Sequence, residues 1–271
     1  VKASEENFKR VVESYRRFRN SFRFILGNLN DFKVRELVNF KNLQAVDKWM
    51  LIKLNELIQK STESYEEYAF FKLYQQLSHF FTVQMSAFYL DIIKDRLYTF
   101  PKKSPERRKA QTVLYHLIDK LLPIMAPVTS FLSEEVYSFF NKEKKESVFL
   151  EDFPKINSQW ICVETQKLFL KLFPLREELN KQLEILRQEG RIGSNLQAKA
   201  YLTLKEDFIS PVLSPSEQLE FFSVSQITIK KGSKTLIKGD LAKGKKCQRC
   251  WFISLNLNEK QICPKCVKNL S

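Results

Sequence analysis

Two C-x-x-C pairs close together near the end of the chain limit what this region can fold into. They contain four of the five cysteines: Cys247 and Cys250 in the first pair, Cys263 and Cys266 in the second. Each pair puts two sulfurs on one tight turn, and two such turns can complete a tetrahedral shell around one ion. We therefore predict one structural zinc ion per chain. Four thiolate ligands leave no open position for catalytic water.

Other uses of cysteine fit this pattern less well. Disulfide frameworks are typical of small secreted domains, whereas this chain has 271 residues and shows no signal peptide. A redox C-x-x-C is usually single and attached to a βαβ unit. The fifth cysteine, Cys162, stands apart from the others.

The composition is strongly basic, with a net charge of +14 and a pI near 9.5. Such a balance is typical of proteins that bind nucleic acid or an anionic membrane surface. No apolar run reaches the roughly 18 residues that span a bilayer, so we expect a soluble, cytoplasmic or organellar protein without a membrane partner. Six glycines argue against glycine-rich phosphate loops. The first residue is Val1, so we expect a piece of something longer.

Apolar residues recur at three- and four-residue steps over most of the first 190 residues, which predicts helices. The predicted helices cover about 4–29, 46–59, 64–97, from Pro105 to Pro123, the stretch "FLSEEVYSFFNK", and 161–189. Arg16, Arg19 and Arg23 border the apolar stripe of the first helix. Arg19 projects partly into it and should pair with a buried acid, or else face another domain or an RNA phosphate.

Short β-branched and aromatic runs then predict a small sheet region within 198–240. The predicted fold class is mainly α: an antiparallel helical bundle (1–155), a helix plus a small β region (156–240) and a zinc-binding module (241–271). A polar linker is expected at 143–158. His79 and His116 fall inside apolar helices, and no catalytic triad, H-E-x-x-H or Walker loop is present, so no active site is predicted.

Several stretches resemble, in the same order, the C-terminal part of class I isoleucyl-tRNA synthetases of the bacterial type. They are "YRRFRNSFRFILGNLNDF" (15–32), "DKWMLIKLNELI" (47–58), "FYLDIIKDRLY" (88–98), "RRKAQTVLYHLIDKLLPIMAPVTSFLSEEVY" (107–137), "ESVFLEDFP" (146–154), "GRIGSNLQAKAYL" (190–202) and the terminal "CQRCW…CPKC". The zinc ending favours the isoleucine enzymes over those for valine or leucine. Tyr137 departs from the family, which commonly has Trp there.

The resemblance implies an anticodon-binding bundle that holds the anticodon stem of tRNA(Ile), and a zinc module that reaches the anticodon loop. Single-stranded loops are bound by aromatic stacking and by arginine hydrogen bonds. The candidate tRNA-binding residues are Arg249, Trp251, Lys245, Lys246, Arg16, Arg19 and Arg23. The family's ATP signatures, H-x-G-H and K-M-S-K-S, are absent from these residues. Catalysis with ATP and Mg²⁺ is therefore expected of another part of a monomeric isoleucine–tRNA ligase.

The sequence alone leaves two other functions possible. Some DNA-repair glycosylases of the formamidopyrimidine type end in a similar four-cysteine finger, but they begin with a catalytic proline, need more strand and need more glycine. A non-catalytic helical adaptor with a zinc clip would bind protein with little dependence on salt. Trp251 itself has two interpretations, because it could stack on RNA or cap the small hydrophobic core of the zinc module.

Overall fold

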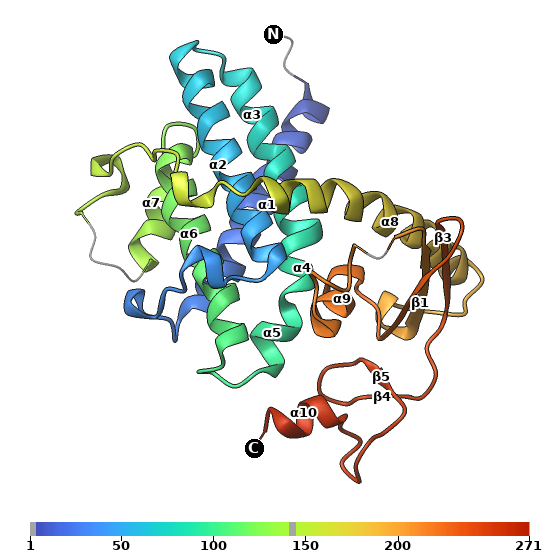
Figure 1. Cartoon of the computed structure of the whole chain (residues 1–271). Coiled ribbons are helices and arrows are strands. Elements are labelled where there is room, and N and C mark those ends of the chain that lie inside the picture. Colours follow the sequence, from blue (N-terminus) through green and yellow to red (C-terminus); the bar gives the residue numbers. More distant parts are fainter. Residues whose placement is uncertain (1–3, 141–144, 207, 271) are drawn as a thin grey trace. The chain divides into compact units, whose positions relative to one another are not determined.

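A computed structural model describes residues 4–140, 145–206 and 208–270, and Figure 1 labels its elements. The chain forms two compact units. The first, here called the helical unit, comprises Val1–Leu43, Asp47–Asp91 and Pro105–Ile161. The second, here called the mixed unit, comprises Gln44–Val46, Ile92–Ser104 and Cys162–Ser271. The three-part division expected from the sequence stays a prediction.

Helix α1 (Glu5–Leu29) begins where its sequence provides a cap. The Ser4 side chain accepts a hydrogen bond from the backbone N–H of Asn7 at 3.3 Å, and two glutamates occupy the first turn. The prediction of a helix at 4–29 is confirmed. Phe18 and Phe22 are buried and pack edge-on or tilted against Phe81, with ring centroids 4.6 and 5.5 Å apart. The apolar stripe ahead of Phe18 is exposed instead of buried.

The predicted helix at 64–97 is wrong as a single element. Helix α2 (Ala45–Glu66) already includes its first residues, and the chain then breaks at Tyr68, which has φ of +53°. The elements after the break are α3 (Phe70–His79), a π-helical stretch (Phe80–Tyr89), α4 (Leu90–Ile92) and α5 (Lys94–Thr99). A wide helical turn of this kind changes which side chains share a face, so a 3.6-residue pattern cannot locate it.

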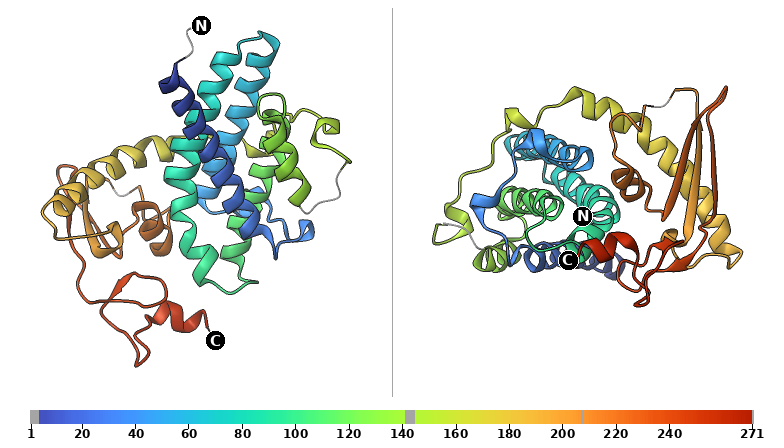
Figure 2. Two further views of the ribbon diagram at one scale, coloured as in Figure 1. Left: turned by 180° about the vertical axis from the view of Figure 1, so that it is seen from behind. Right: turned by 60° about the horizontal axis from the view of Figure 1, so that its bottom comes forward.

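The remaining helices of the helical unit are α6 (Pro105–Met125) and α7 (Ser130–Phe139). Helix α1 packs against α6, α7 and the π-helical stretch, and Figure 2 shows these helices from two further sides. Pro123 lies inside α6 instead of ending it. Short 3₁₀ turns occur at Val34–Glu36, Phe40–Asn42, Val148–Leu150, Ser158–Trp160 and, in the mixed unit, Asn195–Gln197. Residues 143 and 144 of the expected linker lie outside the described residues.

Both histidines lie within helices, as predicted, but the expected core or bundle-lining position is wrong for His79, which is exposed at the end of α3. The His116 ring packs edge-on against Trp160 with centroids 4.9 Å apart. Burial lowers the pKa of His116 to about 4, so its imidazole is neutral near physiological pH. The ring of His116 is therefore a half-buried, uncharged packing group of the helical unit. The prediction of a mainly α fold with a small sheet region is confirmed.

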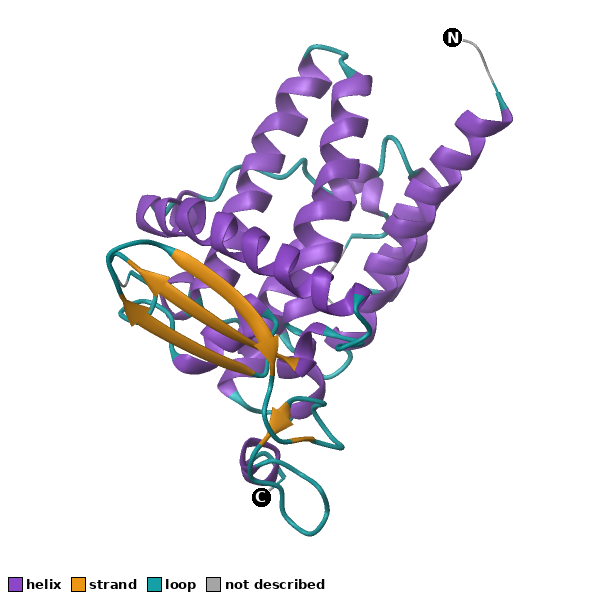
Figure 3. Ribbon diagram, turned by 90° about the vertical axis from the view of Figure 1, so that its right-hand side faces the viewer, coloured by secondary structure: helices purple, strands orange, loops and turns teal. Residues whose placement is uncertain are grey.

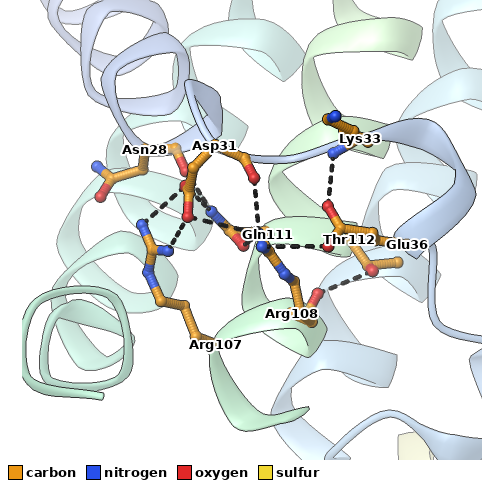
Figure 4. Close-up of polar contacts among 8 residues, drawn as sticks. All are labelled: Asn28, Asp31, Lys33, Glu36, Arg107, Arg108, Gln111 and Thr112. Carbon is orange, nitrogen blue, oxygen red and sulfur yellow. Dashed lines mark hydrogen bonds and ion pairs between the residues drawn. The ribbon is translucent and has the colours of Figure 1, made fainter. Parts of the chain in front are cut away.

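A polar cluster ties the end of α1 to the start of α6, and Figure 4 shows its hydrogen bonds. Asp31 pairs with the guanidinium group of Arg107, and Gln111 Nε2 donates to Asp31 Oδ1 at 2.8 Å. Arg108 donates to the Asp31 carbonyl at 3.1 Å and pairs with Glu36 at 3.2 Å. Burial alone would raise the pKa of Asp31, but the hydrogen bonds and charges of this cluster outweigh it and hold the pKa below its usual range.

We expect Asp31→Asn to lower the free energy of unfolding by about 1–3 kcal/mol near neutral pH, because it weakens charge-assisted hydrogen bonds in a half-buried site. The folded pKa of Asp31 lies below the ordinary value of 3.8. Its contribution is therefore present above that pH and lost as pH falls through the folded pKa. Urea unfolding near neutral pH and below about pH 3 measures both effects.

The control is Glu13→Gln, which removes the exposed ion pair between Glu13 and Arg16 and should change stability little. Equal effects of the two substitutions would contradict a special role for Asp31. An Asp31→Asn variant that lost as much stability in acid as the unchanged chain would contradict the pKa argument.

The mixed unit combines one long helix with a three-stranded sheet. Helix α8 (Val163–Gln188) contains Pro174 and confirms the helix predicted at 161–189. Strand β1 (Ala198–Leu204) lies between β2 (Gln226–Lys231), which runs parallel to it, and β3 (Leu236–Leu241), which runs antiparallel. Figure 3 shows the three strands side by side. Helix α9 (Pro215–Phe222) connects β1 to β2 and was not predicted.

Helix α8 covers one face of the sheet. At Gly239 in β3, a Cβ atom would lie 2.8 Å from Leu183 Cδ2 of α8, so a larger residue there would force the leucine side chain to shift. Phe169 and Phe173 of α8 also pack against Phe221 of α9, with ring centroids 5.7 and 5.8 Å apart. The buried side of β1 therefore faces a core built from α8 and α9.

Candidate functional site

The four cysteine side chains of the two C-x-x-C pairs converge on one point. Their sulfur atoms all lie within 4.8 Å of one another, and Cys250 Sγ is 3.6 Å from Cys263 Sγ. Tetrahedral coordination at about 2.3 Å places sulfurs about 3.8 Å apart, so the arrangement fits a metal ion. All four side chains are less than 9 % exposed and pack against Phe252, Leu257 and Ile262. The predicted metal-ligand set is thus brought together.

Short backbone segments hold the cysteines in place. Strand β4 (Lys245–Lys246) pairs with β5 (Ile253–Ser254), and the turn between them carries the first two cysteines. Gly244 enters this hairpin with φ of +123°, where a Cβ would lie 2.2 Å from the Ser254 carbonyl oxygen. The second pair lies at the start of α10 (Pro264–Lys268), which begins directly after Cys263.

Backbone N–H groups prepare one sulfur for the thiolate form that a metal requires. Burial would raise the pKa of Cys247, but N–H groups of Cys250, Cys263 and Arg249 outweigh it and lower the pKa to about 6. The Cys263 N–H lies 3.3 Å from Cys247 Sγ. Burial raises the pKa of Cys250, and it raises that of Cys266 to about 12. A bound cation would replace those protons, so metal binding should release protons.

Two cations of this segment bind the short helix α5 within the mixed unit. Lys265 Nζ lies 2.7 Å from Asp95 Oδ2, and Arg249 Nη2 donates to the carbonyl oxygen of Thr99 at 2.9 Å. Thr99 is the last residue of α5, where carbonyl groups lack partners within the helix. The cysteine segment is therefore docked on α5. No sequence pattern marked Asp95 or Thr99 for this role.

A third contact connects the cysteine segment to the sheet. The backbone N–H of Ile253 donates to Ser225 Oγ at 2.7 Å, and Ser225 Oγ donates to the carbonyl of Leu196. Ser225 directly precedes β2, and Leu196 lies just before β1. The hydroxyl thus links the β4–β5 hairpin to the start of two sheet strands.

The turn between β4 and β5, residues 247–252, is here called the metal turn. Its most distinctive side chain is Trp251. It directly follows Cys250, has φ of +68° and is 60 % exposed. The left-handed backbone is costly for a bulky residue, and sites with such strain are often functional. Lys246 Nζ lies 5.0 Å from the centre of the indole ring, and Lys245 is also exposed. An exposed indole does not cap the core around the sulfurs, which Phe252 and its neighbours fill instead.

The three arginines of α1 have different environments. Arg19 pairs with both carboxylate oxygens of Glu135, so the predicted pairing with an acid is confirmed. The prediction that this acid is buried is wrong, because both side chains are about half exposed. This pairing raises the pKa of Arg19. Arg16 pairs with Glu13 on the same helix at 3.0 Å. Arg23 is exposed, and no described residue forms an ion pair with it. The tRNA-binding role of all three stays a prediction.

The chain combines a helical bundle, a small sheet and a four-cysteine cluster, and a known family matches more than half of its length. Residues 47–202 match the anticodon-binding domain of tRNA ligases, and the chain belongs to this family. Among the described residues, no helix is long and apolar enough to cross a membrane.

Relatives match almost the whole chain. It is 38 % identical to the isoleucine–tRNA ligase of Petrotoga mobilis over 100 % of its length, and 36 % identical to that of Natranaerobius thermophilus over 98 %. The isoleucine–tRNA ligase of Persephonella marina is 36 % identical over 100 % of the chain. The chain spans about 31 % of the length of these relatives, or 30 % for the last.

We expect Cys263→Ser to lose the bound metal and to unfold the segment from β4 through α10, while the helical unit stays folded. The reason is that this segment has little apolar core besides the sulfurs. Metal content per chain and amide hydrogen exchange of residues 245–270 measure the two effects. Cys162→Ser is the matched control, since Cys162 lies at the start of α8, away from the cluster. Metal retained by Cys263→Ser would contradict the ligand assignment.

Proposed function

We propose that this chain is the tRNA-recognition region of an isoleucyl-tRNA synthetase. The observation that carries the proposal is the match of 98–100 % of the chain to proteins named isoleucine–tRNA ligase. The rest of such an enzyme would join isoleucine to its tRNA with ATP and Mg²⁺. This region would hold tRNA(Ile), as a monomer in the cytoplasm or an organelle.

The metal in this proposal is zinc in a structural role. Four sulfur donors with tetrahedral spacing suit Zn²⁺, and they leave no position for a reacting water. The two positive charges of the ion offset part of the charge of four thiolates, and Lys265 adds a cation beside them. Zinc would thereby keep the turn that presents Trp251 in one conformation.

The exposed surface around Trp251 fits an unpaired RNA loop. An indole supplies a stacking platform for a base, while Lys245 and Lys246 supply charge for phosphates. Arg249 has a structural partner in Thr99, so its proposed contribution to tRNA binding includes holding the metal turn against α5. A direct contact of Arg249 with a base stays a prediction. The arginines of α1 would serve the anticodon stem.

The decisive experiment compares binding of this chain to a tRNA(Ile) transcript and to the same transcript with a changed anticodon, at two salt concentrations, with and without a zinc chelator. We expect a preference for the native anticodon that disappears with chelation, and an affinity that falls steeply with salt. Equal affinity for both transcripts before chelation would contradict anticodon recognition. Binding without salt dependence would favour the protein-binding adaptor instead.

We expect Trp251→Ala to weaken tRNA binding by about 1–3 kcal/mol, which is the usual effect of losing one base stack. Trp251→Phe should retain much of the affinity, because its ring can also stack. Phe149→Ala is the control, since Phe149 is exposed in the helical unit and is not placed at the metal turn. Electrophoretic or filter binding measures all three variants, and zinc content verifies that the metal turn is intact. Full affinity of Trp251→Ala would exclude this stacking role.

A further inference from the structure

One face of the three-stranded sheet carries lysines that the proposed function does not yet use. The strand register places Lys199 opposite Asp240, Tyr201 opposite Lys238, and Thr203 opposite Lys230. Partners in register point to the same side of a sheet, so these six side chains share one face. We call it the lysine face.

The lysine face is the uncovered side of the sheet. Along β1 buried and half-buried residues alternate, and the buried set faces α8 and α9. Lys230 and Lys238 are exposed, and Tyr201 is half-buried.

In the part of the chain that the structure describes, this face carries three lysines against one acid. Among the described residues, no carboxylate forms an ion pair with Lys199, Lys230 or Lys238. The acid on the face, Asp240, lies 3.6 Å from Arg191 Nη2. A surface that presents three lysines of this kind attracts a polyanion.

Protection of sheet edges does not account for all three lysines. Edge strands often carry lysine to prevent pairing with another chain, and this would explain Lys230 in β2 and Lys238 in β3. Lys199 lies in the central strand β1, which has no free edge. Its ammonium group lies 4.5 Å from the centre of the Tyr201 ring, a cation–π contact that holds the charge over the sheet.

The same contact indicates which part of a nucleic acid would bind. The Lys199 side chain occupies one side of the Tyr201 ring, so the ring is less suited to stacking on a base than to positioning the ammonium group. Lysine binds phosphate as a point charge and carries no base-specific pattern. An anionic membrane is less suitable, because surface-bound elements usually present several apolar anchors, whereas Leu236 is the one strongly exposed aliphatic side chain among the described residues of this face.

We propose that the lysine face binds RNA phosphates, as a second and sequence-independent contact in addition to the metal turn. This inference rests on the proposed function, since it takes tRNA as the partner. The metal turn would supply the preference between anticodons, and the lysine face would supply affinity that depends on salt.

The test compares two triple variants of the 271-residue chain, K199Q/K230Q/K238Q and the control K167Q/K171Q/K181Q. The control removes three exposed lysines from α8 in the same unit, so both variants lose equal charge. We expect the first to bind tRNA about 10- to 100-fold more weakly at about 0.1 M salt, with the slope of log K against log salt reduced by about 2. The control should bind nearly as the unchanged chain, and both should keep zinc and their circular dichroism.

Equal losses of tRNA affinity in the two triple variants, or no loss in the first, would overturn the proposal that the lysine face binds RNA phosphates. The proposed function would remain intact if these variants still prefer the native anticodon. Failure of the unchanged chain to bind tRNA would instead overturn the proposed function. Binding to vesicles of phosphatidylserine that depends on the same lysines, with unchanged tRNA affinity, would assign the face to a membrane and overturn the RNA assignment.

Discussion

The convergence of four cysteine sulfurs is the interaction on which the end of the chain depends. The segment from β4 through α10 has two-residue strands, a five-residue helix and three partly buried apolar side chains against the sulfurs. So little apolar surface cannot offset the conformational entropy of ordering the segment, and a metal ion bound by the four thiolates would supply the missing free energy. Because Lys265 and Arg249 also bind α5, folding of this segment and docking of that helix are coupled.

Trp251 lies on the turn that the first two cysteines hold in place, and its ring is exposed. The turn that carries Cys247 and Cys250 forces a left-handed backbone on the next residue, a conformation that glycine adopts at little cost. At Gly244 the chain meets the same kind of demand with glycine. At residue 251 it has tryptophan with a largely exposed ring. A residue that is both strained and exposed contributes little to the core, which favours a contact with a partner as the reason for its presence.

Patterns within one element could be predicted from the sequence, and relationships between distant elements could not. The spacing of the cysteines gave the ligand set, and the periodicity before Leu29 gave α1. The break at Tyr68 and the π-helical stretch were missed because local apolar spacing continues through both. Helix α9 was missed because its aromatic end, Phe221 and Phe222, resembles the start of a strand. The contact of Arg249 with Thr99 joins residues 150 positions apart, and no local pattern indicates it.

The arginines of the chain serve two different purposes, because some hold the fold together and others, such as Arg16 and Arg23, are exposed. Several arginines serve the fold: Arg96 is buried and pairs with Glu220 at 2.9 Å, and Arg107 and Arg108 hold the end of α1. The planar guanidinium group makes several directed hydrogen bonds and is less strongly hydrated than ammonium, so its burial costs less. Lysines such as Lys230 and Lys245 remain in solvent, with Lys265 as a counterexample. The net charge of +14 therefore includes several arginines whose charge is already used within the fold. Since solvated lysines bind phosphates without base specificity, the proposed function implies that affinity for RNA and discrimination between RNAs come from different residues of this chain.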